Sequence, residues 1–211
     1  LTVDAGVKAV NGNTLAAEIV HTPLSSERQK RGLWLATLAF ALSGFALSAM
    51  LTQMVPLLTA LGIGSAALFV STLFGPSQFL MRLTNLLLGA KRHPLTATLL
   101  ALTLLPLAMA ILALSAPWTV GAVLFALLLG FGSGLKSIVQ GTLPLALFGA
   151  QGYGARLGFM SSVRQALAAV APFALAFATE HVGPVAALWA VTLIGVAGLV
   201  CGVLVALDVR R

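Results

Sequence analysis

Three cationic side chains stand inside long apolar stretches of this sequence. They are Arg82, Lys136 and Arg164, and no Asp or Glu lies in the same stretches. A charge at the centre of a bilayer costs about 2.5–3.5 kcal/mol on insertion scales, so each requires a specific interaction. One interpretation is a positive ring that attracts an anion, because Arg can hold a carboxylate or phosphate through two parallel hydrogen bonds. The alternatives are snorkelling towards the headgroups and pairing with acids elsewhere in the protein.

Neutral amide side chains accompany these cations. Five of them are candidate hydrogen-bond partners for a solute: Gln53, Gln78, Asn85, Gln140 and Gln165. The alternative is hydrogen bonding between helices, worth about 0.6 kcal/mol each in a membrane, and we favour it for Gln165. Gln78 is the strongest neutral candidate, because we expect it near the middle of its helix, where transporter sites lie.

Other kinds of chemistry find no support in the sequence. The three histidines, His21, His93 and His181, fall in the segments between apolar stretches, away from Ser133. A serine hydrolase would need the Ser and a His at matching depth. Cys201 is the single cysteine, and no cluster of metal-binding side chains accompanies it. We therefore expect no enzyme, no cofactor and no metal site.

The composition places these residues in a membrane. The chain has 211 residues, of which 59% are hydrophobic and 8% charged, whereas soluble domains carry about 25% charged residues. Residues 1–32 are polar and predict a loop or linker. A helix needs about 20 apolar residues to cross a bilayer. Six stretches meet this length within 33–211: 33–57, 65–88, 94–115, 118–141, 157–179 and 184–207. The sequence predicts an all-α, polytopic membrane protein.

The basic residues outside the apolar stretches indicate its orientation. Apart from Lys8 in the polar N-terminal segment, they lie in four segments that share one side of the membrane if six helices alternate: 28–31, 89–94, 142–156 and 208–211. The other three connections contain no Lys or Arg. The positive-inside rule then places both chain ends in the cytoplasm. The net charge of +7 is explained by this topology, and we do not expect nucleic acid as a partner.

Polarity varies along the six predicted helices with a period of three. The third and sixth contain no ionisable residue in their spans, whereas the first, second, fourth and fifth contain the amides and cations. In the second helix Pro76 precedes Arg82, and in the fifth Arg164 precedes Pro172. This reversed order predicts two three-helix repeats in inverted topology. Two pairs of glycines, Gly130 with Gly134 and Gly198 with Gly202, have the spacing that lets helices approach closely.

These features, with three short motifs, resemble the C-terminal half of a major facilitator superfamily transporter. The motifs are MVPLL at 54–58, FGPSQ at 74–78 and GTLPLALFG at 141–149, which are similar to those of bacterial members. The resemblance implies that 1–32 is the cytoplasmic loop between two halves and that 33–211 holds helices seven to twelve. It further implies an N-terminal six-helix half as partner and a location in a bacterial inner membrane.

The expected function is secondary active transport of a small organic solute by alternating access. The cations favour an anionic or zwitterionic solute, and any proton-coupling acid is expected in the other half, because this half has none in its spans. The residues expected to bind substrate or to gate are Arg82, Lys136, Arg164, Gln78, Gln53, Asn85 and Gln140. The alternatives are a membrane scaffold or assembly subunit that transports nothing, and a drug/proton efflux antiporter.

Overall fold

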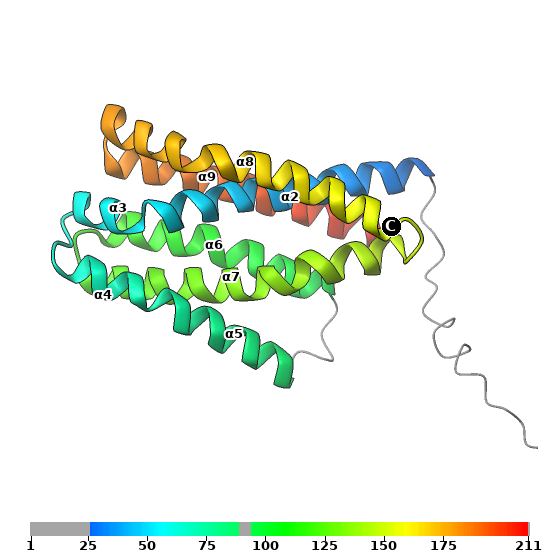
Figure 1. The fold of residues 1–211 in the computed structure, drawn as a ribbon, viewed down its shortest axis with the longest axis horizontal. Coiled ribbons are helices and arrows are strands. Elements are labelled where there is room, and N and C mark those ends of the chain that lie inside the picture. The colour runs from blue at the N-terminus through cyan, green and yellow to red at the C-terminus, as the bar shows by residue number, and fades with distance from the viewer. Residues whose placement is uncertain (1–25, 89–93, 211) are drawn as a thin grey trace, which may run out of the picture.

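The structure is a computed structural model, and it describes residues 26–88 and 94–210. The described chain is all-helical, as the sequence predicts (Figure 1). Its elements are α2 (Ser26–Thr52), α3 (Met54–Ala60), α4 (Ala66–Thr72), α5 (Phe74–Leu88), α6 (Pro94–Ser115), α7 (Thr119–Phe148), α8 (Tyr153–Val182) and α9 (Pro184–Arg210). Helix α6 has the predicted bounds.

Five of the described helices are long and apolar enough to cross a membrane. They are α2, α6, α7, α8 and α9. The start of α2 and the end of α9 lie at the same end of the bundle, where Arg31 Nε is 3.3 Å from Asp208 Oδ2 (Figure 1). The chain is therefore a multi-pass membrane protein.

Two of the predicted spans are not single helices. The span predicted for 33–57 divides at Gln53, between α2 and α3, and the span predicted for 65–88 divides at Leu73, between α4 and α5. Each break lies three residues before a proline, Pro56 in one case and Pro76 in the other. A proline has no N–H, so the carbonyl four residues before it loses its helical donor, and the ring crowds that carbonyl. Both prolines are visible in the sequence, where each was expected to lie within an unbroken helix.

The other differences are at helix ends. Helix α2 begins at Ser26, inside the predicted loop 1–32, and α7 continues to Phe148 rather than ending at 141. The predicted loop before the fifth span therefore shrinks to 149–152, and Arg156 lies in α8. There the Arg156 Nη1 donates to the carbonyl of Phe148, at 2.8 Å, and satisfies one of the free carbonyls at the end of α7. Residues 1–25 and 89–93 lie outside the described residues, so most of the predicted linker and one basic turn cannot be compared.

The helices pack as two groups joined along one side. Helix α2 packs against α8 and α9, α7 packs against α5 and α6, and α6 packs against α9. Buried apolar side chains form two clusters at different heights. The larger includes Met50, Leu58 and Phe125, and the smaller, nearer the chain ends, includes Phe40 and Val139.

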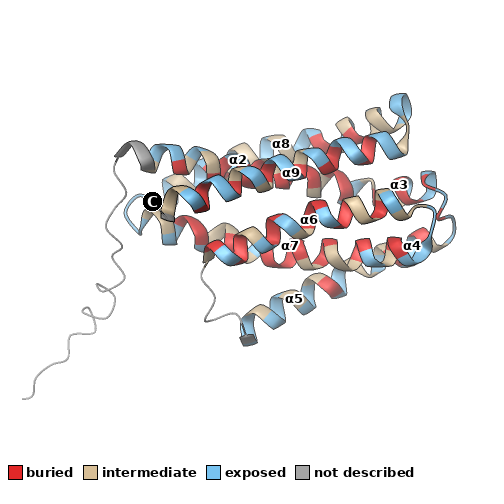
Figure 2. Cartoon of the chain, turned by 180° about the vertical axis from the view of Figure 1, so that it is seen from behind, coloured by how far each residue is buried: buried red, intermediate tan, exposed pale blue. Residues whose placement is uncertain are grey.

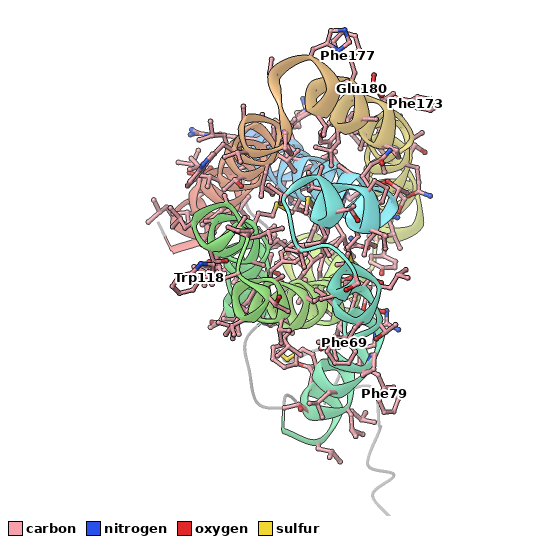
Figure 3. All side chains as sticks on the ribbon, turned by 90° about the vertical axis from the view of Figure 1, so that its left-hand side faces the viewer. Phe69, Phe79, Trp118, Phe173, Phe177 and Glu180 are labelled. Carbon is pink, nitrogen blue, oxygen red and sulfur yellow. The ribbon has the colours of Figure 1, made fainter. Side chains whose placement is uncertain are left out.

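Large apolar side chains also cover the outside of the bundle. Phe69, Phe79, Phe173 and Phe177 point away from its centre (Figure 3) and are 61–79% exposed. Much of α5 is exposed, in contrast to the buried α7 (Figure 2). Apolar patches of this extent mark contact with lipid or with another protein surface.

Glycines bring α5 and α7 close together, as the sequence predicts. A Cβ on Gly130 would lie 2.7 Å from the carbonyl oxygen of Phe74, and one on Gly134 would lie 2.6 Å from that of Gln78. On α9, Gly198 approaches the backbone of α2, and Gly202 approaches Leu102 of α6. Both glycine pairs are therefore packing sites.

We expect Gly134→Ala to destabilise the protein, because the added methyl group meets backbone that cannot yield easily. Overpacking typically costs about 1–3 kcal/mol, partly offset by the better helix propensity of Ala, worth about 1 kcal/mol. Thermal unfolding in detergent measures the difference. Gly75→Ala on α5 is the matched control, since a Cβ at Gly75 meets no atom within 4 Å. Equal stabilities of the two variants would contradict the close-packing role of Gly134.

Candidate functional site

The polar residues of α5, α7 and α8 gather at one level of the bundle. We call this level the cation layer: Gln78 and Arg82 of α5, Ser133, Lys136 and Ser137 of α7, and Arg164 of α8. Along α7 it lies between Leu129 of the larger apolar cluster and Val139 of the smaller one. The layer thus interrupts an otherwise apolar core.

Lys136 is the most deeply buried member of the cation layer. Its relative exposure is 2%, and it ranks among the largest fully buried side chains of the described chain. A snorkelling side chain would lie along the lipid-facing surface, whereas Lys136 is enclosed within the bundle. Its ammonium group therefore depends on partners inside the protein or in a bound ligand.

The side chain of Arg164 on α8 lies beside Gly44 of α2, near Lys136. A Cβ on Gly44 would lie 2.8 Å from Cγ of Arg164 and 3.6 Å from Nζ of Lys136. The aliphatic part of the Arg164 side chain thus occupies the space that a larger side chain at position 44 would fill. Gly44 thereby brings two cations from α7 and α8 together beside α2.

Arg82 of α5 is the third cation, and it is more exposed. Its Nε donates to Oγ of Ser137 at 3.1 Å, and Ser137 directly follows Lys136 in α7. The hydroxyl of Ser137 in turn donates to the carbonyl of Gly134 at 2.7 Å. This chain of hydrogen bonds fixes Arg82 at the level of the other two cations.

The layer contains no carboxylate in the described part of the chain. The acids whose surroundings are described there are Glu180, near the end of α8 remote from the chain ends, and Asp208, which pairs with Arg31. Arg82, Lys136 and Arg164 form no ion pair among the described residues. The layer is therefore electropositive, and the low dielectric of its surroundings strengthens that field relative to water.

Gln78, the strongest neutral candidate, is bound to a neighbouring helix. Its Nε2 donates to Oγ of Ser133 at 2.7 Å, next to the close contact at Gly134. Asn85 and Gln140 are half-buried and form no side-chain hydrogen bond within the described chain, whereas Gln165 is exposed. Asn85 and Gln140 therefore keep their hydrogen-bonding capacity for other partners.

Gln53 lies outside the cation layer, in a contact between α2 and α8. Its Nε2 donates to the carbonyl of Pro172 at 3.4 Å. One turn earlier in α2, Oγ of Ser48 donates to the carbonyl of Ala168 at 2.8 Å. That carbonyl would bond the N–H of residue 172 in a regular helix, and Pro172 has none. Ser48 replaces the missing donor, so this contact holds the proline site of α8 against α2.

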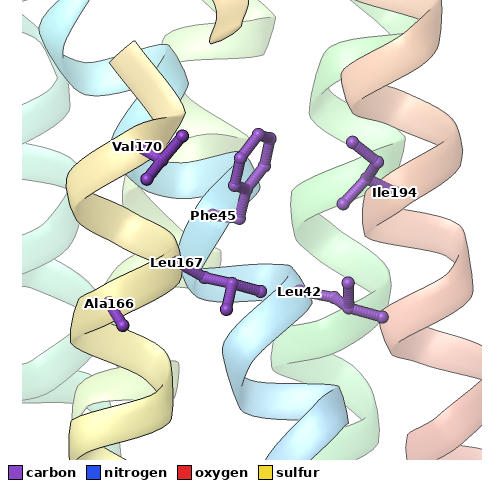
Figure 4. A pocket seen from close by; sticks show the side chains of 6 residues that line it. All are labelled: Leu42, Phe45, Ala166, Leu167, Val170 and Ile194. Atoms are coloured by element: carbon purple, nitrogen blue, oxygen red, sulfur yellow. The ribbon is translucent and has the colours of Figure 1, made fainter. Parts of the chain in front are cut away.

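An apolar groove opens beside these contacts. It has a volume of about 390 Å³ and is lined by Leu42 and Phe45 of α2, Ala166, Leu167 and Val170 of α8, and Ile194 of α9 (Figure 4). Its lining carries no hydrogen-bonding side chain, so it suits hydrocarbon and cannot bind the polar part of a solute.

Neither similarity to known proteins nor a metal-binding group among the described residues indicates a particular chemistry. The chain matches no protein-family model, no curated protein and no solved structure. Within residues 26–88 and 94–210, His, Cys, Asp and Glu side chains form no group of three that could hold a metal. The function must therefore be argued from the cation layer and the packing around it.

Sequence reasoning missed Gly44, Ser48 and Ser137. Gly44 and Ser48 have the small-xxx-small spacing, with a serine as the second small residue, and this signal was not recognised. The role of Ser48 could not be found from its own helix, because Ser48 serves Pro172 of a different helix. Only the pairing of α2 with α8 reveals that role.

Proposed function

We propose that this chain is the C-terminal half of a secondary active transporter of the major facilitator type, which moves a small organic solute by alternating access. In this proposal α4 and α5 together form the second of six spans. The chain ends lie in the cytoplasm, and the membrane is a bacterial inner membrane. Six further helices of the same protein complete the transport path.

The observation that carries the proposal is the symmetry of helix packing. If the spans are numbered one to six, exchanging one with four, two with five and three with six relates the five most extensive contacts to one another, whereas the smaller contact of α8 with α9 has no counterpart of similar extent between α5 and α6. The packing of α2 with α8 becomes that of α7 with α5, and the packing of α2 with α9 becomes that of α7 with α6. The contact of α6 with α9 maps onto itself. Two inverted three-helix repeats would produce this pattern.

The distribution of polar groups supports the same proposal. The cation layer draws its side chains from α5, α7 and α8, and its glycine from α2. Helices α6 and α9 contribute none of them. In an inverted-repeat half, the two third helices would stand at the periphery and the other four would face the path. The exposed apolar residues of α5 and α8, among them Phe79 and Phe173, would then be available to the other half.

Solute counterflow tests the proposal against a scaffold that transports nothing. The full-length protein in proteoliposomes, preloaded in turn with succinate, phosphate, glucose or choline, should accumulate the radiolabelled form of at least one solute class. Protein-free liposomes and heat-inactivated protein are the controls. Failure to move any member of a broad panel, by protein that is inserted and folded, would favour the scaffold. A gene that encodes no helices preceding Leu1 would require a dimer of this chain instead.

A further inference from the structure

The ammonium group of Lys136 lacks a counter-charge in the described structure. The side chain is 2% exposed, and buried charges are normally paired or bound to an ion of opposite sign. Within the described chain neither Glu180 nor Asp208 lies in the cation layer, and Lys136 forms no hydrogen bond there. A buried cation without a partner in the described chain marks a candidate binding site for an anion.

A second cation meets Lys136 at Gly44. The Cγ of Arg164 and the Nζ of Lys136 lie 2.8 Å and 3.6 Å from the same point, the position of a Cβ on Gly44. The two side chains thus meet beside Gly44, and like charges repel each other more strongly in a low dielectric than in water. An anion bound between the two cations is attracted by both, and these two attractions offset the repulsion between the cations. The absence of a side chain at Gly44 leaves room for Arg164 to lie there.

We propose that Lys136 and Arg164, beside Gly44, bind a carboxylate or phosphate group of the transported solute. The inference rests on the proposed transport function and names the substrate class of that site. The guanidinium of Arg164 offers two parallel N–H donors to a two-oxygen group, and Lys136 contributes a compact positive charge. Arg82, held by Ser137, adds positive potential at the same level.

Anion binding tests the inference without requiring transport. The full-length protein is placed in nanodiscs of phosphatidylcholine, and its thermal unfolding is followed while succinate, inorganic phosphate or choline is added at constant ionic strength. A ligand that binds the folded protein raises its melting temperature by an amount that grows with the logarithm of one plus the ratio of the free ligand concentration to Kd. Succinate or phosphate should raise it, and choline should not. Nanodiscs that contain phosphatidylglycerol form a separate arm, which detects binding of a lipid headgroup.

Variants locate the binding site. Lys136→Met and Arg164→Gln should each weaken anion binding by roughly tenfold to a hundredfold, the loss expected for one charge-assisted hydrogen bond. Gly44→Ala should weaken it less, because the stem of Arg164 must move aside. Two matched controls should leave it unchanged: Arg31→Gln, an exposed cation at the bundle end, and Gly158→Ala on α8, where a Cβ meets no atom within 4 Å.

Each other outcome overturns the inference. It is wrong if neither anion stabilises the protein, if stabilisation survives in both Lys136→Met and Arg164→Gln, or if phosphatidylglycerol alone stabilises. A marked loss of stability in Lys136→Met, without any anion effect in the wild type, would show that an acid of the protein itself neutralises Lys136. The two experiments separate this inference from the transport proposal. Anion binding without counterflow would support the anion site and contradict transport. Counterflow of glucose or choline alone would support transport and contradict the anion site.

Discussion

Lys136→Met is expected to make the ligand-free protein more stable and to lower the activity of the proposed transporter at least tenfold. The substitution removes a buried charge and keeps a side chain of similar length and volume. Replacing a buried ion pair by apolar groups of similar volume is often neutral or stabilises by about 1–4 kcal/mol, and an unpaired buried charge has no Coulomb attraction to lose. At 2% exposure Lys136 has little access to water, and no ion pair among the described residues compensates it. Stability and activity should therefore change in opposite directions.

The activity of this variant should fall steeply. Loss of one charge-assisted hydrogen bond to an anionic solute corresponds to about 1.5–3 kcal/mol, or roughly tenfold to a hundredfold. Thermal unfolding in detergent and counterflow in proteoliposomes measure the two effects. Arg31→Gln is the control, because its exposed side chain should contribute less than about 0.5 kcal/mol. If Lys136→Met instead destabilised the protein while transport continued, Lys136 would be a structural residue with an acid partner.

Ser48→Ala is expected to destabilise the packing of α2 against α8, and Pro172→Ala is expected to reverse most of that loss. The hydroxyl of Ser48 donates to the carbonyl of Ala168 at 2.8 Å, which Pro172 leaves without a helical donor. Removing the hydroxyl leaves a part-buried carbonyl without a partner, at a cost of about 1–3 kcal/mol. In a bilayer no water replaces the lost bond.

The reversal follows from the same geometry. An Ala at position 172 restores an N–H that can bond the carbonyl of Ala168, so Ser48 is no longer needed. A double-mutant cycle of thermal unfolding measures the coupling, which we expect to be about 1–2 kcal/mol. Ser162→Ala on α8 is the control, because its hydroxyl bonds only the carbonyl of Gly158 within its own helix, at 2.9 Å. Additive effects of Ser48→Ala and Pro172→Ala would contradict the idea that the hydroxyl of Ser48 replaces the N–H donor that Pro172 lacks.

The proline site also has a consequence for motion. A helix whose carbonyl is bonded by a neighbouring helix can bend there without losing a backbone hydrogen bond of its own. Gln53 donates to the carbonyl of Pro172 from the break between α2 and α3. The break between α2 and α3 and the proline of the continuous helix α8 therefore lie at one level. In the proposed transporter this is a place where α2 and α8 would bend together.

The membrane character, the helical class and most helix locations could be predicted from the sequence alone. Apolar length is a local property, so six stretches could be recognised without knowledge of their neighbours, and α6 has the predicted bounds. Spacing of small residues is local too, and the close contacts at Gly130 and Gly134 confirm the prediction for that pair. The breaks at Gln53 and Leu73 were missed, although Pro56 and Pro76 were visible. A proline in an apolar span can be accommodated in a continuous helix, as Pro106 is in α6, so its presence alone does not predict a break.

Which polar groups lie close together depends on the packing of the helices. Arg82, Lys136 and Arg164 were candidates from their residue types, but three separate helices carry them, and sequence spacing says nothing about distances between helices. The packing buries Lys136, leaves Arg82 exposed and brings Arg164 over Gly44. Gly44 and Ser48 have a spacing that predicts a close helix contact, but the spacing does not show their partners, the Arg164 side chain and the carbonyl of Ala168, which lie more than a hundred residues away. Contacts between helices distant in sequence are set by the complementary shapes and buried hydrogen bonds of the whole bundle, which no local pattern encodes.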